Sequence, residues 1–462
     1  MTVKVVVVGG DAAGMSAAAQ ARKKAGRDKL EIVAFERGHF TSYSACGIPY
    51  WIGGIVDGPD ELVARTPESF HDLDIDVRMR HEVVGIDLDR REVVAHDLSA
   101  DGREVREGFD HLVYAAGAVP VAPEWAHVDA GGVFGVQTLD DGAAIHEWLE
   151  REPAPRTAVV VGGGYIGVEM AEAMIRRGLA VTLVERSPQP MASVDPDMGE
   201  RVREAICGLG IEVRTGVTVS GLETAEGRVR AVDTDSGALA ADIVVLGLGV
   251  RPNTALAADS GIPLGVTGGL RTDLRMRVVG PDGPVDGVWA AGDCTQKLHL
   301  VSGQPVLAPL GTHANKQGRV AGINIGGGYA TFPGVIGTAV TKVCELEVAR
   351  TGLTEKEATA AGYAFVTAAV ESTSRAGYYP GGGTMVVKLI AEKRTGRLLG
   401  GQIVGREEAA KRIDALAVAL WNRMTVEEMT ALDLSYAPPF APVWDPVLIA
   451  ARKATDAVHA EG

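Results

Sequence analysis

A continuous run of apolar, mostly β-branched residues opens the chain and ends in two glycines. This run, VKVVVVGG at 3–10, is typical of a parallel strand buried on both faces. Residues 11–26 are rich in helix-forming alanine and end at Gly26, and a second apolar run, LEIVAFE, follows at 30–36. The pattern predicts a strand, a helix and a second parallel strand, which together form one βαβ unit.

The same order of patterns recurs in the middle of the chain, at 157–185. An apolar strand pattern leads into a glycine-rich turn, a helical pattern that ends at Gly178, and another strand pattern. Two similar nucleotide-binding folds are therefore predicted in tandem.

The pattern changes after a glycine-rich linker at 326–329. Residues 338–353 and 384–392 alternate apolar and polar positions, as half-buried antiparallel strands do. Helical patterns follow at 406–423 and 425–432. The predicted fold class is therefore α/β, with two Rossmann-like dinucleotide-binding domains followed by a C-terminal α+β domain.

Length, charge and cysteine spacing narrow the choice of function. The chain has 462 residues, which suggests about three domains. Its formal net charge of −15 would repel nucleic acid. No apolar run approaches the roughly 20 residues of a membrane helix, and no signal-peptide pattern is present, so we expect a cytoplasmic protein. Cys46, Cys207, Cys294 and Cys344 are too scattered to predict a metal site or a structural disulfide.

The glycine loop of the second fold has the regular dinucleotide pattern. Gly162, Gly164 and Gly167 follow a predicted strand and open a predicted helix, so the backbone and the helix N-terminus can approach a pyrophosphate. Glu185 ends the next strand, where a carboxylate accepts bonds from ribose hydroxyls and repels a 2′-phosphate. This favours NADH over NADPH, although the adjacent Arg186 acts in the opposite direction.

The glycine loop of the first fold is irregular. Gly9 and Gly14 hold the outer positions, Asp11 occupies the middle one, and Glu36 ends the next strand. Two dinucleotide folds imply two dinucleotides, and the economical pair is a tightly held flavin and an exchangeable nicotinamide. Asp293, at a turn in AAGDC, can hold a ribityl hydroxyl. The alternative for this loop is a tight turn that binds no ligand.

Cys46 is the candidate for redox chemistry. It lies in TSYSACGIPYWIGG at 41–54, where Gly47 and Pro49 predict a helix that begins at the cysteine. A thiol at a helix N-terminus has a lowered pKa and becomes a thiolate. The alternative is a buried thiol in a capped turn.

Taken together, these motifs resemble the pyridine nucleotide–disulfide oxidoreductase superfamily over almost the whole chain. The single-cysteine branch, which contains coenzyme A disulfide reductases, NADH oxidases and NADH peroxidases, fits best. Besides the two loops and Cys46, the resemblance is carried by YAAGAVP at 114–120, GVRPNT at 249–254, WAAGDC at 289–294, PLGTHANKQGRVAGINI at 309–325, YYPGG at 378–382 and YAPPFAPVWDPV at 436–447.

The resemblance implies a domain plan and a subunit arrangement. Residues 1–118 and 251–328 would form a discontinuous FAD domain, 119–250 the NAD(P)H domain, and 329–462 a C-terminal dimerisation domain. The implied assembly is a homodimer in which the partner's C-terminal domain completes the active site. Its Tyr436, assisted by Tyr378 or Tyr379, would act as a proton donor beside Cys46; the alternative for each tyrosine is packing at the dimer interface.

The expected cofactors are a tightly bound FAD and an exchangeable NADH, which is favoured over NADPH. No metal is expected. The residues expected to contact FAD are Gly9, Gly10, Ala13, Gly14, Glu36, Arg37, Ser42, Val83, Ala116, Gly117, Asp293, Pro309 and Leu310. The residues expected to contact the nicotinamide dinucleotide are Gly162, Gly164, Tyr165, Ile166, Gly167, Glu185 and Gly249.

Three positions depart from patterns within the superfamily. Trp51 and its neighbours offer no second cysteine, which excludes the two-cysteine mechanism of the glutathione-reductase type. Relatives that reduce peroxide, or oxygen to water, carry a histidine where this chain has Ala12. Coenzyme A disulfide reductases usually have an asparagine where this chain has Ala45, so the choice of substrate stays open.

We therefore expect an FAD-dependent NAD(P)H:disulfide oxidoreductase that uses Cys46 to reduce a small disulfide, persulfide or polysulfide. One alternative is an NADH oxidase or a quinone or dye reductase of the same branch. Another, of a different class, is a redox-sensing flavoprotein with little turnover. Basic residues on the first helix, Arg22, Lys23 and Lys24, either meet phosphates of a coenzyme A substrate or form a solvated helix face.

Overall fold

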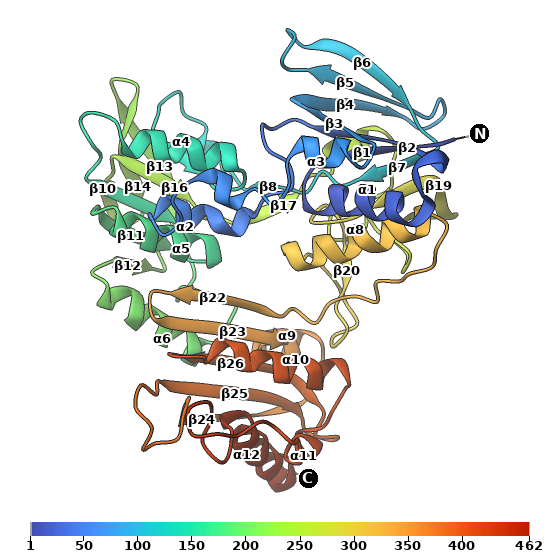
Figure 1. Cartoon of the computed structure of the whole chain (residues 1–462). Helices are drawn as coiled ribbons and strands as arrows, with labels where there is room; N and C mark the ends of the chain where they lie inside the picture. The colour runs from blue at the N-terminus through green and yellow to red at the C-terminus, as the bar shows by residue number, and fades with distance from the viewer. Residues whose placement is uncertain (1, 462) are drawn as a thin grey trace.

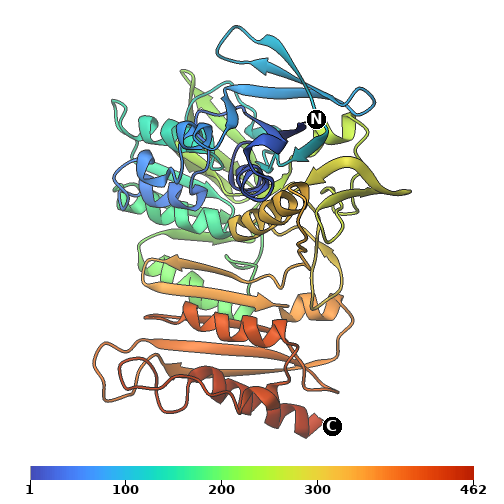
Figure 2. The same cartoon turned by 45° about the vertical axis from the view of Figure 1, so that its right-hand side comes forward.

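The computed structural model describes residues 2–461 and arranges them around three main sheets. Two mostly parallel sheets lie side by side, and an antiparallel sheet formed by the C-terminal part of the chain lies below them in Figures 1 and 2. The predicted fold class is confirmed: two Rossmann-like folds are joined to a C-terminal α+β domain.

The first sheet combines strands from two distant parts of the sequence. Its order is β18-β19-β7-β1-β2-β3, and β1 pairs in parallel with both β2 and β7. The bounds are β1 Val3–Val8, β2 Leu30–Glu36, β3 Ile75–Met79, β7 His111–Tyr114, β18 Arg277–Gly280 and β19 Gly283–Ala290. The strand before Asp293 therefore lies in the same sheet as the strand before the first glycine loop.

Two helices of this fold, α1 (Ala12–Ala25) and α8 (Gly311–Ile325), pack with their backbones in contact (Figure 1). A Cβ atom at Gly318 would overlap the carbonyl oxygen of Ala13, and one at Gly322 would overlap that of Ala17. Glycine is therefore required at both positions for the two helices to approach so closely.

Shorter elements connect and extend the first sheet. A separate antiparallel sheet contains β4 His81–Asp87, β5 Glu92–Asp97 and β6 Arg103–Gly108. The two Rossmann-like folds are connected by an antiparallel pair, β8 Ala118–Pro120 and β17 Val250–Pro252. The remaining elements are α2 Ile48–Ile52, α3 Pro67–His71, α7 Ala255–Asp259, β20 Lys297–Leu298 and β21 Pro305–Val306.

The second sheet has the order β12-β11-β10-β16-β9, and all of its pairs are parallel. Its strands are β9 Val133–Gly135, β10 Thr157–Val161, β11 Ala180–Glu185, β12 Glu212–Thr215 and β16 Ile243–Leu246. The helices of this fold are α4 Leu139–Leu149, α5 Tyr165–Arg176 and α6 Pro196–Gly208, and its antiparallel extension is β13 Val219–Ala225, β14 Arg228–Thr234 and β15 Gly237–Ala240.

The third sheet is antiparallel throughout, in the order β22-β23-β26-β25-β24. Its strands are β22 Ala339–Val343, β23 Leu346–Gly352, β24 Phe365–Thr373, β25 Thr384–Glu392 and β26 Leu398–Gly405. Helices α9 Glu355–Ala360, α10 Ile413–Trp421, α11 Val426–Met429 and α12 Pro446–Glu461 accompany it.

The C-terminal elements differ in detail from the predicted ones. The pattern at 338–353 forms a hairpin of two strands, because Cys344 adopts a left-handed turn conformation with φ of 54°. The helical pattern at 406–423 forms a helix only from Ile413, after a 3₁₀ turn. The long helix α12 was not singled out, since its many alanines weaken the apolar periodicity.

One hydrophobic core continues from the second fold into the C-terminal sheet. Val202 and Ile206 of α6 belong to the same buried cluster as Val348 and Val404 of the C-terminal strands. An ion-pair cluster lies at the same boundary. There the Lys388 Nζ, on β25, lies 2.6 Å from Glu355 Oε1, 2.7 Å from Asp197 Oδ1 and 3.2 Å from Asp195 Oδ2.

Gln402 of β26 completes this cluster through two bonds with Asp195. Its amide donates to Asp195 Oδ2 at 2.6 Å, and its carbonyl oxygen accepts from the Asp195 backbone N–H at 2.7 Å. The start of α6 is thus fixed to the C-terminal sheet by buried charges as well as by apolar packing.

Within residues 2–461, none of the helices combines the length and the apolar character that a bilayer crossing requires.

Lys388→Met should lower the free energy of unfolding by about 3–5 kcal/mol, because it leaves the buried carboxylate of Asp195 without its cation. Lys411→Met is the matched control: Lys411 pairs with Asp414 in the exposed part of the same domain and should cost less than about 1 kcal/mol. Chemical denaturation of both variants measures the difference, and equal effects would contradict a stabilising role for the buried cluster.

Candidate active site

The second glycine loop has the geometry that its sequence predicts. Gly162 has φ of 105° and donates from its N–H to Val184 O at 2.8 Å, while a Cβ at Gly167 would overlap Gly162 O. Glu185, at the end of β11, accepts from Gly163 N–H and from Ser187 N–H, both at 2.6 Å. Its carboxylate is therefore held beside the loop, where a ribose of a bound dinucleotide would lie.

The first loop has the same geometry in spite of its irregular sequence. Gly9 has φ of 103° and donates to Phe35 O at 3.0 Å, and a Cβ at Gly14 would overlap Gly9 O. Glu36 accepts from Gly10 N–H at 2.9 Å and from Gly38 N–H at 2.7 Å. The carboxylate that ends each second strand thus makes equivalent contacts in both folds.

Asp11 explains how the irregular loop keeps this shape. It is the N-cap residue of α1, with φ of −118°, a conformation that does not require glycine. Burial, opposed by a bond from Tyr43 N–H and reinforced by Glu36 and Asp293, raises the pKa of Asp11 to about 6. The Thr41 hydroxyl donates to Gly10 O. These bonds attach the loop to the segment that carries Cys46.

The turn that carries Asp293 lies against this loop. Gly292 has φ of 91°, and a Cβ there would lie 2.9 Å from the Cβ of Ala13. The Asp293 carboxylate accepts from the N–H of Leu310, the N-cap residue of α8. Its Oδ1 is buried and has no hydrogen-bond partner in the protein. Such an acceptor fits a hydroxyl group supplied by a ligand.

Other predicted contact residues lie around the same loop. A Cβ at Gly9 would approach Ala116 Cα to 3.2 Å, and Asn253 bonds through its side chain to Ala116 O and through its N–H to Gly117 O. Arg37 forms an ion pair with Glu82 at 3.9 Å. Since Glu82 directly precedes Val83 on β4, Arg37 and Val83 lie near each other.

The remaining predicted residues lie on both folds and in the segment before Cys46. Ser42 has φ of 49° and accepts from Ala64 N–H, and Pro309 is exposed just before α8. Tyr165 and Ile166, both half-buried, begin α5 after Gly164. Gly249 lies apart from this loop, at the connection between the folds, where its carbonyl accepts from Val121 N–H.

Cys46 lies in a 3₁₀ turn, Ala45–Gly47, that leads directly into α2 with Pro49 in its first turn. The residue is exposed and forms no disulfide. Burial of its sulfur, together with the charges of Glu169 and Asp293, raises the pKa of Cys46. The expected lowering is therefore wrong for this chain: α2 has only five residues, and two carboxylates outweigh the weak effect of a helix so short.

Glu169, on α5, is one of the charges that act on Cys46. This carboxylate accepts from the Thr341 hydroxyl at 2.6 Å, and burial raises its pKa. One turn later on α5, Glu172 accepts from Cys344 N–H at 2.7 Å. Both partners lie on or after β22, so α5 connects the cysteine segment to the C-terminal domain. The only sequence signal was their i, i+3 spacing on a predicted helix.

Tyr378 and Tyr436 lie next to each other, away from Cys46 of the same chain. Tyr378 is in the loop between β24 and β25, which lies in the lower part of Figure 1, whereas α2 lies in the upper part. Their exposed fractions are 77% and 48%. A hydrogen bond between the two side chains raises the pKa of Tyr378.

Comparison with known proteins identifies the family. Residues 3–318 match the family described as pyridine nucleotide-disulphide oxidoreductase, and residues 338–446 match its dimerisation domain. The chain belongs to the pyridine nucleotide-disulphide oxidoreductase family. Membership implies FAD and a pyridine nucleotide as cofactors, and the dimerisation domain indicates a homodimer.

Relatives of full length carry two kinds of name. An NAD(P)H coenzyme A polysulfide/persulfide reductase of Pyrococcus horikoshii is 38% identical, over 98% of each chain. A protein of Methanocaldococcus jannaschii that is 35% identical, also over 98% of each chain, is named NADH oxidase. The solved structure of an NAD-dependent persulfide reductase from A. fulgidus is similar with a TM-score of 0.93 and 36% identity, over 99% of this chain and 84% of that one.

The described residues fit the flavin that the family implies. Gly9 and Gly14 pack against backbone atoms with no room for a side chain, as a tight dinucleotide loop requires. The buried Oδ1 of Asp293 has no partner in the protein and can accept a hydrogen bond from a ligand hydroxyl. By contrast, Arg22 is 6% exposed and donates to four backbone carbonyls, at Gly26, Arg27, Leu30 and Asp74. Arg22 is therefore structural and does not meet a phosphate.

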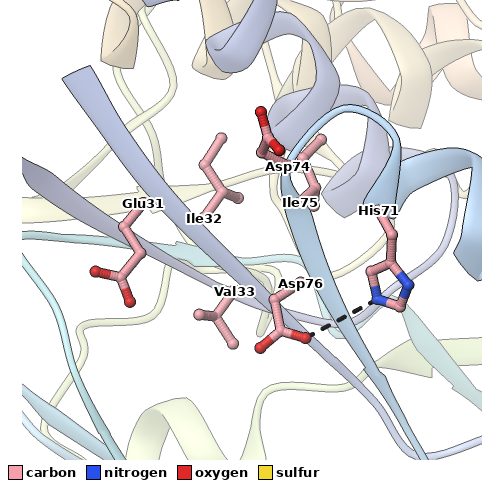
Figure 3. Close-up of a pocket in the computed structure, with 7 residues that line it drawn as sticks. All are labelled: Glu31, Ile32, Val33, His71, Asp74, Ile75 and Asp76. Atoms are coloured by element: carbon pink, nitrogen blue, oxygen red, sulfur yellow. Dashed lines mark ion pairs between the residues drawn. The ribbon is translucent and has the colours of Figure 1, made fainter. Parts of the chain in front are cut away.

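A surface hollow of about 290 Å³ lies elsewhere (Figure 3). It is lined by backbone and side chains of β2 and β3, with His71 4.0 Å from Asp76 and two further carboxylates, Glu31 and Asp74. None of these residues belongs to either glycine loop or to the Cys46 segment. Within residues 2–461 no group of three or more histidine, cysteine and carboxylate side chains is arranged to hold a metal ion.

The raised pKa of Asp11 predicts a pH-dependent difference between the protein and its Asp11→Asn variant. The folded state binds the carboxyl proton more tightly than the unfolded state, so the contribution of Asp11 to stability falls as pH rises from about 4 through about 6. Above pH 7 the variant should be more stable by up to about 3 kcal/mol. Denaturation of the FAD-free protein between pH 4 and 8 measures this, with exposed Asp28→Asn as control; a pH-independent difference would remove Asp11 as the cause.

Proposed function

We propose that the protein is an FAD-dependent NAD(P)H:disulfide oxidoreductase that reduces a small disulfide, persulfide or polysulfide through Cys46. The observation that carries the proposal is the position of Cys46. Its thiol is exposed, yet it lies close enough to Asp293 and Glu169 for both charges to act on it. Cys46 thus lies where the turn that carries Asp293, in the first fold, meets α5 of the second fold. The persulfide reductase relatives support a sulfur substrate.

NADH is the proposed electron donor. The Glu185 carboxylate is fixed by two backbone bonds, so it cannot easily turn away from a 2′-phosphate, which it would repel. The name of the A. fulgidus relative, an NAD-dependent enzyme, agrees with this choice. A higher kcat/KM for NADPH than for NADH would contradict it.

The chemistry assigned to Cys46 is thiol–disulfide exchange. Its thiolate attacks one sulfur of the substrate, a new S–S bond to Cys46 forms, the substrate S–S bond breaks, and the second sulfur leaves as a thiolate. Two electrons then cleave the mixed disulfide and restore the Cys46 thiolate. When bound, FAD supplies the carrier that accepts these electrons from NADH and delivers them to sulfur. The Gly9–Gly14 loop, Glu36 and Asp293 would hold it.

A proton donor for the leaving sulfur is proposed to come from the partner subunit. Tyr436 and Tyr378 are exposed, hydrogen-bonded to each other, and remote from Cys46 of their own chain. A homodimer that covers this surface would bring one subunit's tyrosines to the other's cysteine. The hydrogen bond with Tyr436 raises the pKa of Tyr378 and makes Tyr378 a weaker acid. Tyr436 is therefore the proposed proton donor for the sulfur, beside a Cys46 thiol whose pKa is also raised.

NADH oxidation by oxygen is the second candidate, favoured by the M. jannaschii relative. Ala12 offers no imidazole at the loop where peroxide- and oxygen-reducing relatives carry a histidine. Oxygen consumption with NADH, measured with and without an added disulfide, separates the two functions. A rate that no disulfide or polysulfide increases would favour the oxidase.

Cys46→Ser should retain bound FAD and its reduction by NADH but lose at least 1000-fold in disulfide reduction, because serine cannot form the mixed disulfide. Cys207→Ser, which changes an exposed cysteine on α6, is the control and should keep full activity. Steady-state turnover with coenzyme A disulfide and with polysulfide checks this. Undiminished turnover of the Cys46 variant would exclude the proposed role.

Tyr436→Phe should lower kcat about 100-fold or more at neutral pH, the usual contribution of a general acid, with KM changed much less. Tyr329→Phe is the control, since Tyr329 is also exposed but lies after α8, against Arg275 and not beside Tyr378. Mixed dimers provide the decisive measurement: pairing Cys46→Ser subunits with Tyr436→Phe subunits leaves one site wholly intact and one doubly impaired if the residues act across the interface. Half of the wild-type activity would support the arrangement, and near-complete loss would contradict it.

A further inference from the structure

Lys297 is a buried cation close to the proposed flavin site that the mechanism above does not use. It begins β20, four residues after Asp293, and is 3% exposed. Its Nζ donates to Gly292 O at 3.0 Å and to Thr295 O at 3.3 Å. The ammonium group therefore lies under the same turn that presents Asp293.

This cation lacks the close counter-ion that buried lysines normally have. Among residues 2–461, no carboxylate oxygen lies within 4.0 Å of its Nζ. Burial lowers the pKa of Lys297, and the more distant charge of Asp293 acts in the opposite direction. Lys388, the other buried lysine, is surrounded by three carboxylates. Lys297 is therefore held by carbonyl groups and not by a contacting carboxylate.

The turn around Lys297 is rigid enough to direct this charge. Gln317 of α8 accepts from Gly292 N–H at 2.9 Å and from the Thr295 hydroxyl at 3.1 Å, and Thr295 also donates to Gly292 O at 2.7 Å. Gly292 in turn packs against Ala13 of the first glycine loop. The ammonium is thus fixed beside both segments that would hold FAD, in surroundings that screen it poorly.

We infer that Lys297 stabilises the reduced form of bound FAD and so raises its midpoint potential. Reduction adds two electrons from the nicotinamide to the cofactor and makes it more negative, whereas the oxidised ring system is neutral. A fixed positive charge therefore favours the reduced state. Lys297 itself gains and loses neither electrons nor protons. The inference rests on FAD in the first fold and not on the identity of the sulfur substrate.

The test is the flavin midpoint potential of the FAD-loaded dimer, measured without oxygen against reference dyes, with neither NADH nor sulfur compounds present. When the applied potential equals the wild-type midpoint, the ratio of reduced to oxidised FAD in Lys297→Met should be at least about tenfold lower than in the wild type. For a two-electron couple this corresponds to a shift of about −30 mV. Lys297→Arg, which keeps the positive charge, should have a midpoint potential close to that of the wild type.

Lys316→Met is the matched control, because it removes the same charge from the exposed side of the adjacent helix α8, where water screens it. A potential unchanged in Lys297→Met would overturn the inference and leave Lys297 as a cap for two carbonyl groups. If Lys297→Met does not retain FAD, Lys297→Gln takes its place, because glutamine is neutral but keeps a hydrogen-bond donor. The midpoint potential of Lys297→Gln is then compared with that of Lys297→Arg. Equal potentials would again overturn the inference. Because no substrate is used, an enzyme that reduces no disulfide still gives a clear result.

Discussion

Helices α1 and α8 touch along their backbones, and the whole cofactor cradle depends on that contact. It joins segments about 300 positions apart in the chain, since α8 begins at Gly311 and α1 at Ala12. Only because Gly318 and Gly322 have no side chains can the turn at Gly292 come against Ala13. The glycine loop, the free acceptor of Asp293 and the buried charge of Lys297 are neighbours for this reason. A larger residue at either glycine would separate the two halves of the site before it touched any ligand.

The electrostatic character of this region is set by carboxylates drawn from different elements. Asp11, Asp293 and Glu169 are all partly removed from water, all have raised pKa values, and two of them act on Cys46. Together with burial, the charges of Glu169 and Asp293 raise the pKa of Cys46. Lys297 provides a buried charge of the opposite sign, held by two carbonyl groups of the turn that presents Asp293.

The parts of the site that could be predicted are those fixed by local sequence. Both glycine loops, and Glu36 and Glu185 at the ends of their strands, follow from one βαβ unit each, so a short stretch of residues contains the whole signal. The raised pKa of Cys46 comes first from burial and then from Glu169, which is distant in sequence and comes near the sulfur only through the packing of α5 beside α2. Lys297 was overlooked for a similar reason: its sequence shows a lysine, and only the fold shows that it is buried. Helix α12 was missed because an alanine-rich segment has little apolar periodicity, whereas α10 and α11 lie within the predicted helical patterns.

The buried charge cluster at Lys388 bears on how the second fold can move. Helix α6 is anchored to the C-terminal sheet through Asp195, and α5 is anchored to it through Glu169 and Glu172. Two helices of the second fold are thus attached to the sheet at separate points. Displacing this fold from the sheet would break both sets of contacts at once.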